Sequence, residues 1–547
     1  MIRTGRIFRN INGWSLLSMI FIILIILPNF QILGGIFKES NENWLHIKEY
    51  LLKDYMINSM ILITITGIFT VIIGVSLAWV ISVYDFPLRN FLKWALVLPL
   101  AIPPYIAAYT YNGILGYTGA IQSYLRNLMH IQVNQKYFDI MSMEGAIFIF
   151  TFFLFPYVYI ITRSFLEKQS SSLIENARLL GRNSFEIFLF VIFPLSRGAI
   201  IGGGSLVILE VLNDYGVVQY FAIPTFSTAI FKTWFGMGDL DSAVKLSSML
   251  MVIIFLIMFL EKMARGRKRF SFTTTKVKPI MRQKLKGYQG ILVCSYSLMI
   301  FSIGFIIPTI QLLQWSLLTY KKILNYKFID LIFNSLWITF ISSGFIIIVA
   351  IIIANYCRIN DSWISRIYSK ITILGYSIPG AVIAIGAIVF FINLDYKMGW
   401  LYKLIIPQSG RLVLSTSIIM LIFAYVIRFL AIGYNSIDSG FSKIGLRFHE
   451  ASRTLGMGIT ETFIKVDLKM VKSAILGGFI LVYVDILKEL PLTLLLRPFN
   501  FNTLATKAYQ YANDEMIQEA AIASIIIIII SALSIYLFYR VVDKEVK

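Results

Sequence analysis

The chain has 547 residues, of which 58% are hydrophobic and 14% are charged, and its mean hydropathy is +0.76. Soluble domains carry about a quarter charged residues, so this composition excludes a soluble globular protein and indicates an integral membrane protein. The formal net charge of +20 fits contact with anionic lipid headgroups. No nucleic-acid-binding motif accompanies the basic residues, so we expect membrane lipid and no nucleic acid as a partner.

Apolar runs of about 20 residues, the length that crosses a bilayer as a helix, recur along the chain. They predict about twelve spans, near residues 14–36, 57–83, 94–116, 142–162, 198–220, 243–261, 290–313, 333–356, 371–393, 412–433, 473–496 and 520–539. The first run follows Arg3, Arg6 and Arg9 and lacks a small-residue cleavage site, so we expect it to be a retained span. The sequence therefore predicts an all-α membrane protein.

Lysine and arginine are enriched in the segments that lie inside the cell if the N-terminus is cytoplasmic. The densest basic stretch runs from Lys262 to Lys286. This bias predicts that both termini are cytoplasmic.

Three pairs of matching segments recur about 275 residues apart. They begin at Asn58 and Asn334, at Pro103 and Pro379, and at Glu175 and Glu450. An offset of an even number of spans keeps both copies in the same orientation. We therefore predict two parallel six-helix halves, 1–261 and 290–547, joined by a basic cytoplasmic linker at 262–289.

The longest inside loop of each half lies between its fourth and fifth spans, at 170–197 and 440–472. In the first loop, Ser172 and Glu175 have the spacing of a capping box, and Gly181 ends the short helix that this predicts. Ser184 is the expected cap of a second helix. A single loop of this kind also fits an amphipathic helix resting on headgroups, whereas two matched loops on one side favour docking of a two-fold partner.

Both loops resemble the cytoplasmic signature of ABC importer permeases, in which Glu-Ala-Ala precedes a Gly and a later Pro. The residues that carry or flank it are Glu175, Ala177, Arg178, Gly181 and Pro194 in the first loop and Glu450, Ala451, Arg453 and Gly456 in the second. Asn176 replaces the first Ala in one loop. In the other loop, Ser452 replaces the second Ala and Lys469 stands in the place of Pro.

This resemblance implies the importer-type permease fold and a subunit without catalytic activity. Each loop would form a coupling elbow that docks into one of two copies of an ATP-binding subunit. ATP and Mg²⁺ would bind to that subunit, and this chain would bind no cofactor. A periplasmic or lipid-anchored binding protein would deliver the substrate, and the chain would lie in the cytoplasmic (inner) membrane of a prokaryote.

Two further segments, Asn213–Asp239 and Glu489–Tyr509, resemble the fused two-half permeases for iron(III). The resemblance implies iron(III) as the substrate. Thiamine permeases share the fused architecture, and sulfate or molybdate permeases share the elbow, so thiamine and an oxyanion are the alternatives.

The chain has no Gly-Lys-Ser/Thr phosphate loop, so ATP hydrolysis is expected on another subunit. The three histidines, His46, His130 and His449, have no partners at metal-ligand spacing, and we expect His449 to be a solvated interface residue. Cys294 and Cys357 fall at different predicted depths, which argues against a disulfide. Because no catalytic constellation is present, the sequence predicts a transporter subunit and not an enzyme.

Charged residues interrupt the fifth span of each half, where charges are costly. Asp485 and Glu489 lie four residues apart, and Glu210 and Asp214 repeat this spacing about 275 residues earlier. The spacing places each pair on one face of its helix. Lys488 has no basic counterpart in the first half.

Two interpretations of these charges remain open. In the first, the four carboxylates face a translocation path, which favours a hard cation and repels oxyanions. In the second, Lys488 pairs with Asp485 or with a neighbouring acid as a buried structural lock. The outer loops 221–241 and 498–518 are interpreted either as re-entrant segments that gate the outer end and meet the binding protein, or as interfacial loops with aromatic anchors.

A twelve-span secondary transporter driven by an ion gradient is the alternative from another class, and the acids in the membrane would then relay protons. The paired elbow loops argue against it. Uptake that persists after ATP depletion, with the proton gradient intact, would favour this alternative.

Overall fold

The computed structural model describes residues 13–546 except 38, 132, 168, 170, 266–281, 361 and 406–411. Most of the predicted linker lies outside the described residues. Within them, the regular secondary structure is helical apart from β1 (Tyr84–Asp85) and β2 (Gln283–Lys284), which pair in parallel. Ten described helices are long and apolar enough to cross a membrane, or up to twelve if each of two bent helix pairs is one span. The all-α prediction is confirmed.

The helices follow the same order in both halves of the chain. The first half contains α2 (Gly13–Gly34), η1 (Gly35–Phe37), α3 (Glu42–His46), η2 (Ile47–Leu51), α4 (Leu52–Val83), α5 (Arg89–Ala95), η3 (Leu98–Ala101), α6 (Pro104–Leu115), α7 (Ala120–Asn127), η4 (Gln135–Tyr137), α8 (Met143–Glu167), α9 (Ser171–Leu179), α10 (Ser184–Ile187), η5 (Phe188–Ile192), α11 (Phe193–Asn213), α12 (Gly216–Tyr220), α13 (Phe226–Phe231), η6 (Lys232–Gly236) and α14 (Leu240–Arg265). The second contains α15 (Tyr288–Phe301), η7 (Ser302–Ile306), α16 (Ile307–Ile323), α17 (Tyr326–Ile359), α18 (Trp363–Ser377), α19 (Gly380–Ile405), α20 (Ile418–Ile444), α21 (Arg447–Thr454), α22 (Ile459–Thr462), η8 (Phe463–Asp467), α23 (Leu468–Met470), α24 (Lys472–Leu487), α25 (Pro491–Leu496), α26 (Leu504–Asn513) and α27 (Ile517–Val546). The π-helical segments η5 and η8 occupy equivalent places 275 residues apart.

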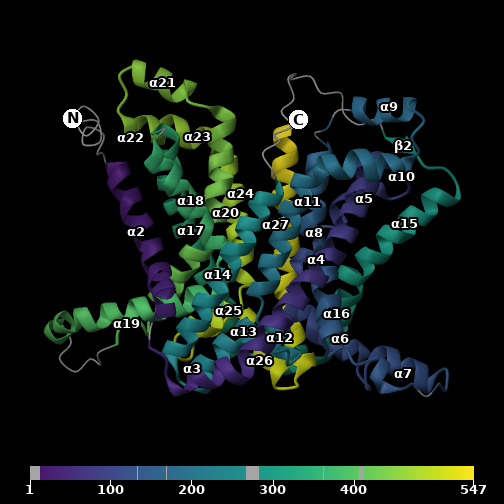
Figure 1. Ribbon diagram of the computed structural model, residues 1–547, viewed down its shortest axis with the longest axis horizontal. Helices are drawn as coiled ribbons and strands as arrows, with labels where there is room; N and C mark the ends of the chain where they lie inside the picture. The colour runs from purple at the N-terminus through teal and green to yellow at the C-terminus, as the bar shows by residue number, and fades with distance from the viewer. Residues whose placement is uncertain are drawn as a thin grey trace.

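The two halves exchange their first helices. Figure 1 shows α2 beside α17 and α18 of the second half, and α15 beside α5 of the first half. Phe21 of α2 packs edge-on against Phe345 of α17, with ring centroids 6.3 Å apart. In the reciprocal contact, the Tyr111 hydroxyl of α6 donates to the backbone oxygen of Ile303 at 2.6 Å. Each half is therefore completed in space by a helix of the other.

Several predicted spans are broken where proline or glycine interrupts them. The helices on either side of Pro103 are bent by 92°, and the predicted span 371–393 is split between α18 and α19, next to Pro379. The predicted span 473–496 ends at Leu487, and α25 starts again at Pro491. Proline has no backbone N–H and clashes with the preceding turn, so helices end before it.

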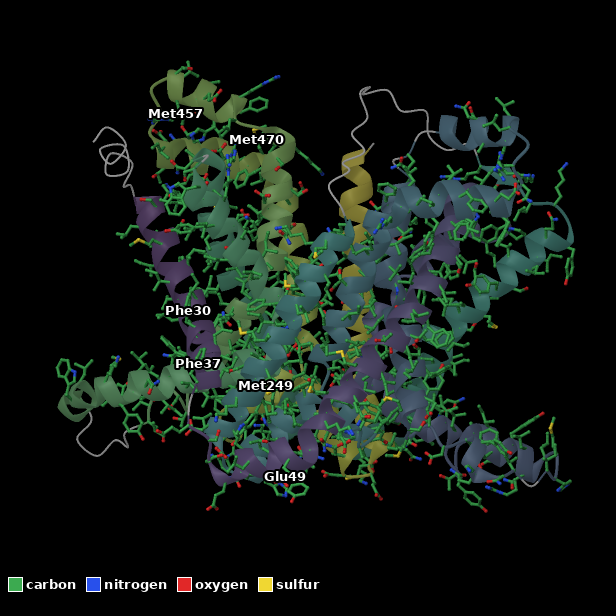
Figure 2. The ribbon with its side chains drawn as sticks, viewed as in Figure 1. Phe30, Phe37, Glu49, Met249, Met457 and Met470 are labelled. Atoms are coloured by element: carbon green, nitrogen blue, oxygen red, sulfur yellow. The ribbon has the colours of Figure 1, made fainter. Side chains whose placement is uncertain are left out.

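Both elbow loops lie at one end of the molecule. In Figure 1, α9 and α21 lie along the top of the bundle, whereas α3, α12, α13 and α26 lie at the bottom. Figure 2 shows Met457 and Met470 at the elbow end and Glu49 at the opposite end. The structure therefore places the two loops on one side, as a parallel repeat requires.

The lateral surface is apolar. Phe30 of α2 and Phe37 of η1 point away from the bundle (Figure 2) and are 68% and 88% exposed. A soluble protein would bury such side chains, so their exposure fits a surface that is covered by lipid.

The short helices at the end opposite the elbows are built alike in both halves. Thr225 and Thr503 each form a capping box at the start of α13 and α26. The backbone N–H that opens each helix donates to a serine of a long span: Phe226 to Ser59 at 3.3 Å and Leu504 to Ser335 at 2.7 Å. These buried caps satisfy backbone groups that lie away from water, and they hold the ends of the two halves opposite the elbows in equivalent positions.

Candidate functional site

A cavity of about 90 Å³ lies where the broken helices of the two halves meet. It is lined by the breaks after α11 and α24, by the starts of α6 and α12, and by side chains of α8, α18 and α20. All five charged residues predicted for the fifth spans line it: Glu210, Asp214, Asp485, Lys488 and Glu489. The structure thus brings together two acidic pairs that are about 275 residues apart in sequence.

The second acid of each pair caps the N-terminus of a short helix. Asp214 Oδ1 accepts a hydrogen bond from the backbone N–H of Val217 at 2.8 Å, at the start of α12. Glu489 Oε1 accepts one from the backbone N–H of Leu492 at 3.1 Å, at the start of α25. Both bonds span three residues, which is the geometry of a helix N-cap. These two acids therefore have a matched structural role.

The first acid of each pair is held differently in the two halves. Glu210 Oε1 accepts a hydrogen bond at 2.8 Å from the Tyr376 hydroxyl, which belongs to α18 of the other half. Asp485 forms an ion pair with Lys488, with 2.7 Å between Oδ1 and Nζ. Both side chains of this pair remain about a fifth exposed, so the pair predicted for the structural lock exists and faces the cavity.

Arg428 of α20 also lines the cavity and was not identified from the sequence. Its side chain is buried, and its guanidinium donates to the backbone oxygens of Ile378 and Tyr376, just before the break at Pro379. A single arginine within the apolar run IFAYVIRFLAIGY was the signal, since an isolated charge in a span calls for a functional or structural partner.

The N-terminus of α19 approaches the second acidic pair. The backbone N–H of Gly380 donates to Asn213 Oδ1 at 2.5 Å. A Cβ at Gly380 would come within 2.9 Å of Glu489 Oε1, so glycine permits this close approach. The positive end of a helix dipole stabilises a nearby carboxylate.

The cavity favours a small cation over an anion. Four carboxylates face Lys488 and Arg428, which leaves two formal negative charges in excess, and Tyr105, Tyr157 and Tyr376 add phenolic oxygens. Oxygen donors of this kind suit hard cations. Among the residues that the structure describes, no group of three or more His, Cys, Asp or Glu side chains is placed to hold a metal ion. The acids therefore line one common cavity.

Both elbows end on a glycine in left-handed backbone, with φ +80° at Gly181 and +91° at Gly456. After α9, the N–H of Gly181 donates to the Arg178 oxygen and the N–H of Arg182 to the Ala177 oxygen. After α21, Gly456 and Met457 make the same two bonds to Arg453 and Ser452. This pair of bonds is the Schellman motif, in which glycine reverses the chain after a helix.

The elbow residues divide into an inward and an outward set. Ala177 and Ser452, at equivalent positions, are buried, which explains why a small side chain is required there. Leu180 and Leu455, which directly precede the glycines, are 83% and 84% exposed. The exposed leucines form an apolar tip on each elbow that no described residue covers.

The other predicted elbow residues lie on or beside these tips. Glu175 is partly exposed, and Glu450, Ala451 and Arg453 are exposed. Arg178 donates to Gln283 of β2 at 3.1 Å, and Pro194 begins the regular part of α11 after η5.

Two sequence-based expectations about the elbows were wrong. Asn183 caps α10 in place of Ser184: its side chain accepts from the N–H of Glu186 at 2.8 Å, and Glu186 accepts from the N–H of Asn183 at 3.1 Å. His449, expected to be solvated, is buried, and its Nδ1 lies 2.7 Å from Asp467 Oδ2. Both errors depend on neighbours that helical periodicity does not identify.

Comparison with known proteins agrees with this geometry. The sequence model of the family described as binding-protein-dependent transport system inner membrane component matches residues 70–265 and again 346–547. An Fe(3+)-transport system permease protein of Haemophilus influenzae is 22% identical over 89% of this chain and 90% of its own length. A probable sulfate transport system permease protein of Prototheca wickerhamii is 30% identical over 28% of this chain and 58% of its own. A spermidine/putrescine transport system permease protein of Haemophilus influenzae is 27% identical over 36% of this chain and 72% of its own.

Proposed function

The chain belongs to the family of binding-protein-dependent transport system inner membrane components, and from this premise we propose that it is the permease subunit of an ATP-driven importer of iron(III). The family domain occurs twice, and the duplication covers both elbows and both acidic pairs. The membership favours an ATP-driven importer over a gradient-driven secondary transporter. The relatives are transport permeases, which supports a subunit that is not an enzyme.

Two copies of an ATP-binding subunit dock on the elbows. The support is matched geometry at the end of the molecule where α9 and α21 lie (Figure 1): each of these helices is followed by an exposed leucine and a left-handed glycine. Exposed apolar side chains on a rigid turn are typical anchors for a protein partner. ATP and Mg²⁺ bind to that partner, and the elbow side faces the cytoplasm with both termini, in the inner membrane of a prokaryote.

The main observation that supports a cation path is the position of the four carboxylates around one cavity between the halves. Because Asp214 and Glu489 cap short helices, we assign the path to Glu210 and Asp485, and a structural role to the second acid of each pair. The excess negative charge opposes passage of sulfate. A periplasmic or lipid-anchored binding protein delivers the substrate at the end opposite the elbows.

Iron(III) is favoured among cations by an Fe(3+)-transport relative that matches nearly the whole chain and by the hard oxygen donors. The cavity, at about 90 Å³, is smaller than the roughly 150 Å³ site that admits benzene, so in this conformation it suits an ion and not thiamine. A polyamine is the second candidate, because it is also cationic and a polyamine permease is among the relatives.

Uptake into proteoliposomes that contain the chain, its ATP-binding subunit and its binding protein tests the proposal. We expect ATP-dependent uptake of labelled iron(III), and a loss of roughly tenfold or more in the double variant E210Q/D485N, because the path loses both carboxylates that we assign to it. D330N, which neutralises an exposed acid near the start of α17, is the matched control, and its iron(III) uptake should be unchanged.

Each other outcome has a definite meaning. Spermidine uptake without iron uptake assigns the polyamine function. If E210Q/D485N fails to assemble with the ATP-binding subunit, the acids form a structural lock and the path assignment is wrong. Uptake that continues without ATP overturns the ATP-driven mechanism.

A further inference from the structure

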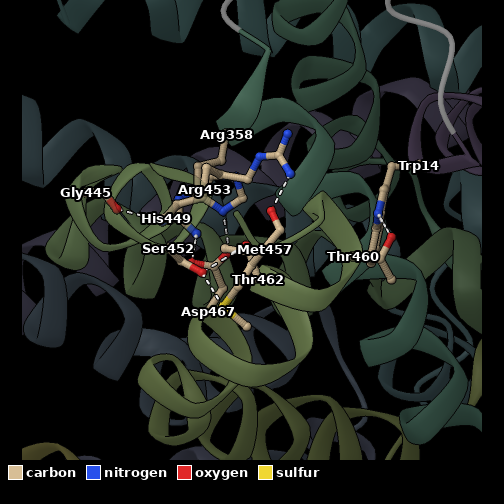
Figure 3. A network of polar contacts seen from close by, with 10 residues as sticks. All are labelled: Trp14, Arg358, Gly445, His449, Ser452, Arg453, Met457, Thr460, Thr462 and Asp467. Carbon is tan, nitrogen blue, oxygen red and sulfur yellow. Dashed lines mark hydrogen bonds and ion pairs between the residues drawn. The ribbon is translucent and has the colours of Figure 1, made fainter. Parts of the chain in front are cut away.

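A buried ionic cluster lies beneath the second elbow. Asp467, in η8, has a fully buried side chain and contacts two basic groups (Figure 3). Its Oδ2 lies 2.7 Å from His449 Nδ1 on α21, and its Oδ1 lies 3.2 Å from Arg358 Nη1 at the end of α17. The side chains of Arg358 and His449 are only 7% and 8% exposed.

The cluster ties the elbow to the membrane helices. Arg358 Nη2 donates to the backbone oxygen of Gly445 at 2.6 Å, where α20 ends, and the guanidinium lies 4.5 Å from the centre of the Phe441 ring. Through Arg358, Asp467 therefore connects α17 and α20 with α21 and η8. Buried charges of this kind keep a defined geometry because a displaced partner leaves an uncompensated charge in a medium of low dielectric.

Among the residues that the structure describes, the first half does not repeat this buried cluster. Its ion pairs before the elbow, Lys93–Glu167 and Arg163–Glu167 at the end of α8, leave the Glu167 side chain 32% exposed. The offset of 276 that relates Asn58 to Asn334 makes Ser82 the counterpart of Arg358, and the offset of 275 between the elbows makes Ile174 and Ile192 the counterparts of His449 and Asp467. Ser82 is buried, and Ile192 belongs to an apolar cluster that also contains Ala177 of α9. The two elbows thus have the same backbone turn and different supporting contacts: apolar packing of α9 and a partly exposed ion-pair group at the end of α8 for the first, and a buried charge cluster for the second.

We propose that Asp467, with Arg358 and His449, is a positioning device for the second elbow alone, so that coupling through the two elbows is not equivalent. Movement of α17 or α20 during transport reaches the second elbow through directional ionic contacts. At the first elbow, the same movement reaches α9 through apolar contacts, which tolerate sliding. The inference rests on the proposed docking of an ATP-binding subunit at both elbows.

Crosslinking at each elbow separately tests this asymmetry. In a chain whose two native cysteines are replaced by Ser, L180C or L455C is crosslinked to lysines of the ATP-binding subunit in nanodiscs. We expect D467N to lower crosslinking from L455C roughly tenfold or more, because Arg358 is left buried without its counter-charge, and to leave crosslinking from L180C unchanged. The ratio of substrate transported to ATP hydrolysed should fall as well.

A second variant separates positioning from folding. R358Q/D467N removes both charges and retains polar side chains, so it should recover most of the L455C crosslinking, since no unpaired charge remains. E461Q is the control on the same elbow, because it removes only the exposed ion pair with Lys465, which contributes little.

The outcomes are distinct. Equal loss at L180C and L455C in D467N would show a general folding defect and overturn the proposal, as would unchanged crosslinking at L455C. If neither cysteine crosslinks in the unmodified background, the docking of the ATP-binding subunit is wrong, and the proposed function fails first.

Discussion

Substitution of the two elbow glycines tests the coupling mechanism through backbone geometry. A Cβ built on Gly181 or Gly456 meets no atom within 4 Å, so a side chain finds no steric obstacle in this chain. The cost is that of holding an L-residue at φ +80° or +91°, which is about 1–2 kcal/mol at each position. Asn tolerates this conformation better than Ala, and the β-branched Val tolerates it least.

We expect the affinity of each elbow for the ATP-binding subunit to fall in the order Gly, Asn, Ala, Val. A cost of about 1–2 kcal/mol corresponds to a loss of roughly five- to thirtyfold per elbow, because a relaxed turn moves Leu180 or Leu455 away from the partner. Titration of the purified ATP-binding subunit onto the chain in nanodiscs, read by stimulated ATP hydrolysis, measures this affinity. G238A is the matched control, since Gly238 also has positive φ and open space but lies outside the elbows.

The order of the measured affinities decides whether backbone geometry or side-chain size controls docking. If Asn weakens docking as much as Val while Ala does not, side-chain size at the partner interface is responsible, and the backbone argument is refuted. Full retention of coupled ATP hydrolysis in the double Val variant would remove the elbow assignment altogether.

Four further substitutions probe the cavity. K488M should lower the free energy of unfolding by about 1–3 kcal/mol, because Asp485 loses its ion-pair partner. Recovery of Tm in K488M/D485N would confirm the pair. An unchanged Tm with altered uptake would assign Lys488 to the path. D214N and E489Q should each lower the free energy of unfolding by about 1 kcal/mol, because each weakens a helix cap, and both should retain most iron(III) uptake. Loss of uptake at unchanged Tm would contradict the division between capping and path acids. G380A should lower the free energy of unfolding by about 1–3 kcal/mol through overpacking, because its Cβ would come within 2.9 Å of Glu489 Oε1. An unchanged Tm would show that α19 moves freely there.

Much of the candidate site was predictable because its determinants are local. The spacing of Asp485 and Glu489 is a property of one helix, and the need for glycine at position 181 follows from the end of one short helix. The cap at Asn183 was missed although Glu186 stands at capping-box spacing from it. Arg428 and His449 could not be assigned from sequence, because their partners, Ile378 and Asp467, come from other elements.

The sequence by itself determined that this chain lies in a membrane, that it is duplicated, and that each copy carries a glycine-ended elbow and an acidic pair. These features follow from composition, from an internal offset and from turn chemistry. Only the tertiary structure decided that α2 and α15 are exchanged between the halves, that the two acidic pairs share one cavity, and that different contacts support the two elbows. Apolar helix surfaces are satisfied by lipid as well as by protein, so an apolar pattern specifies a span and not its neighbour. The neighbour is chosen by close packing and by a few polar contacts between residues that lie far apart in the chain.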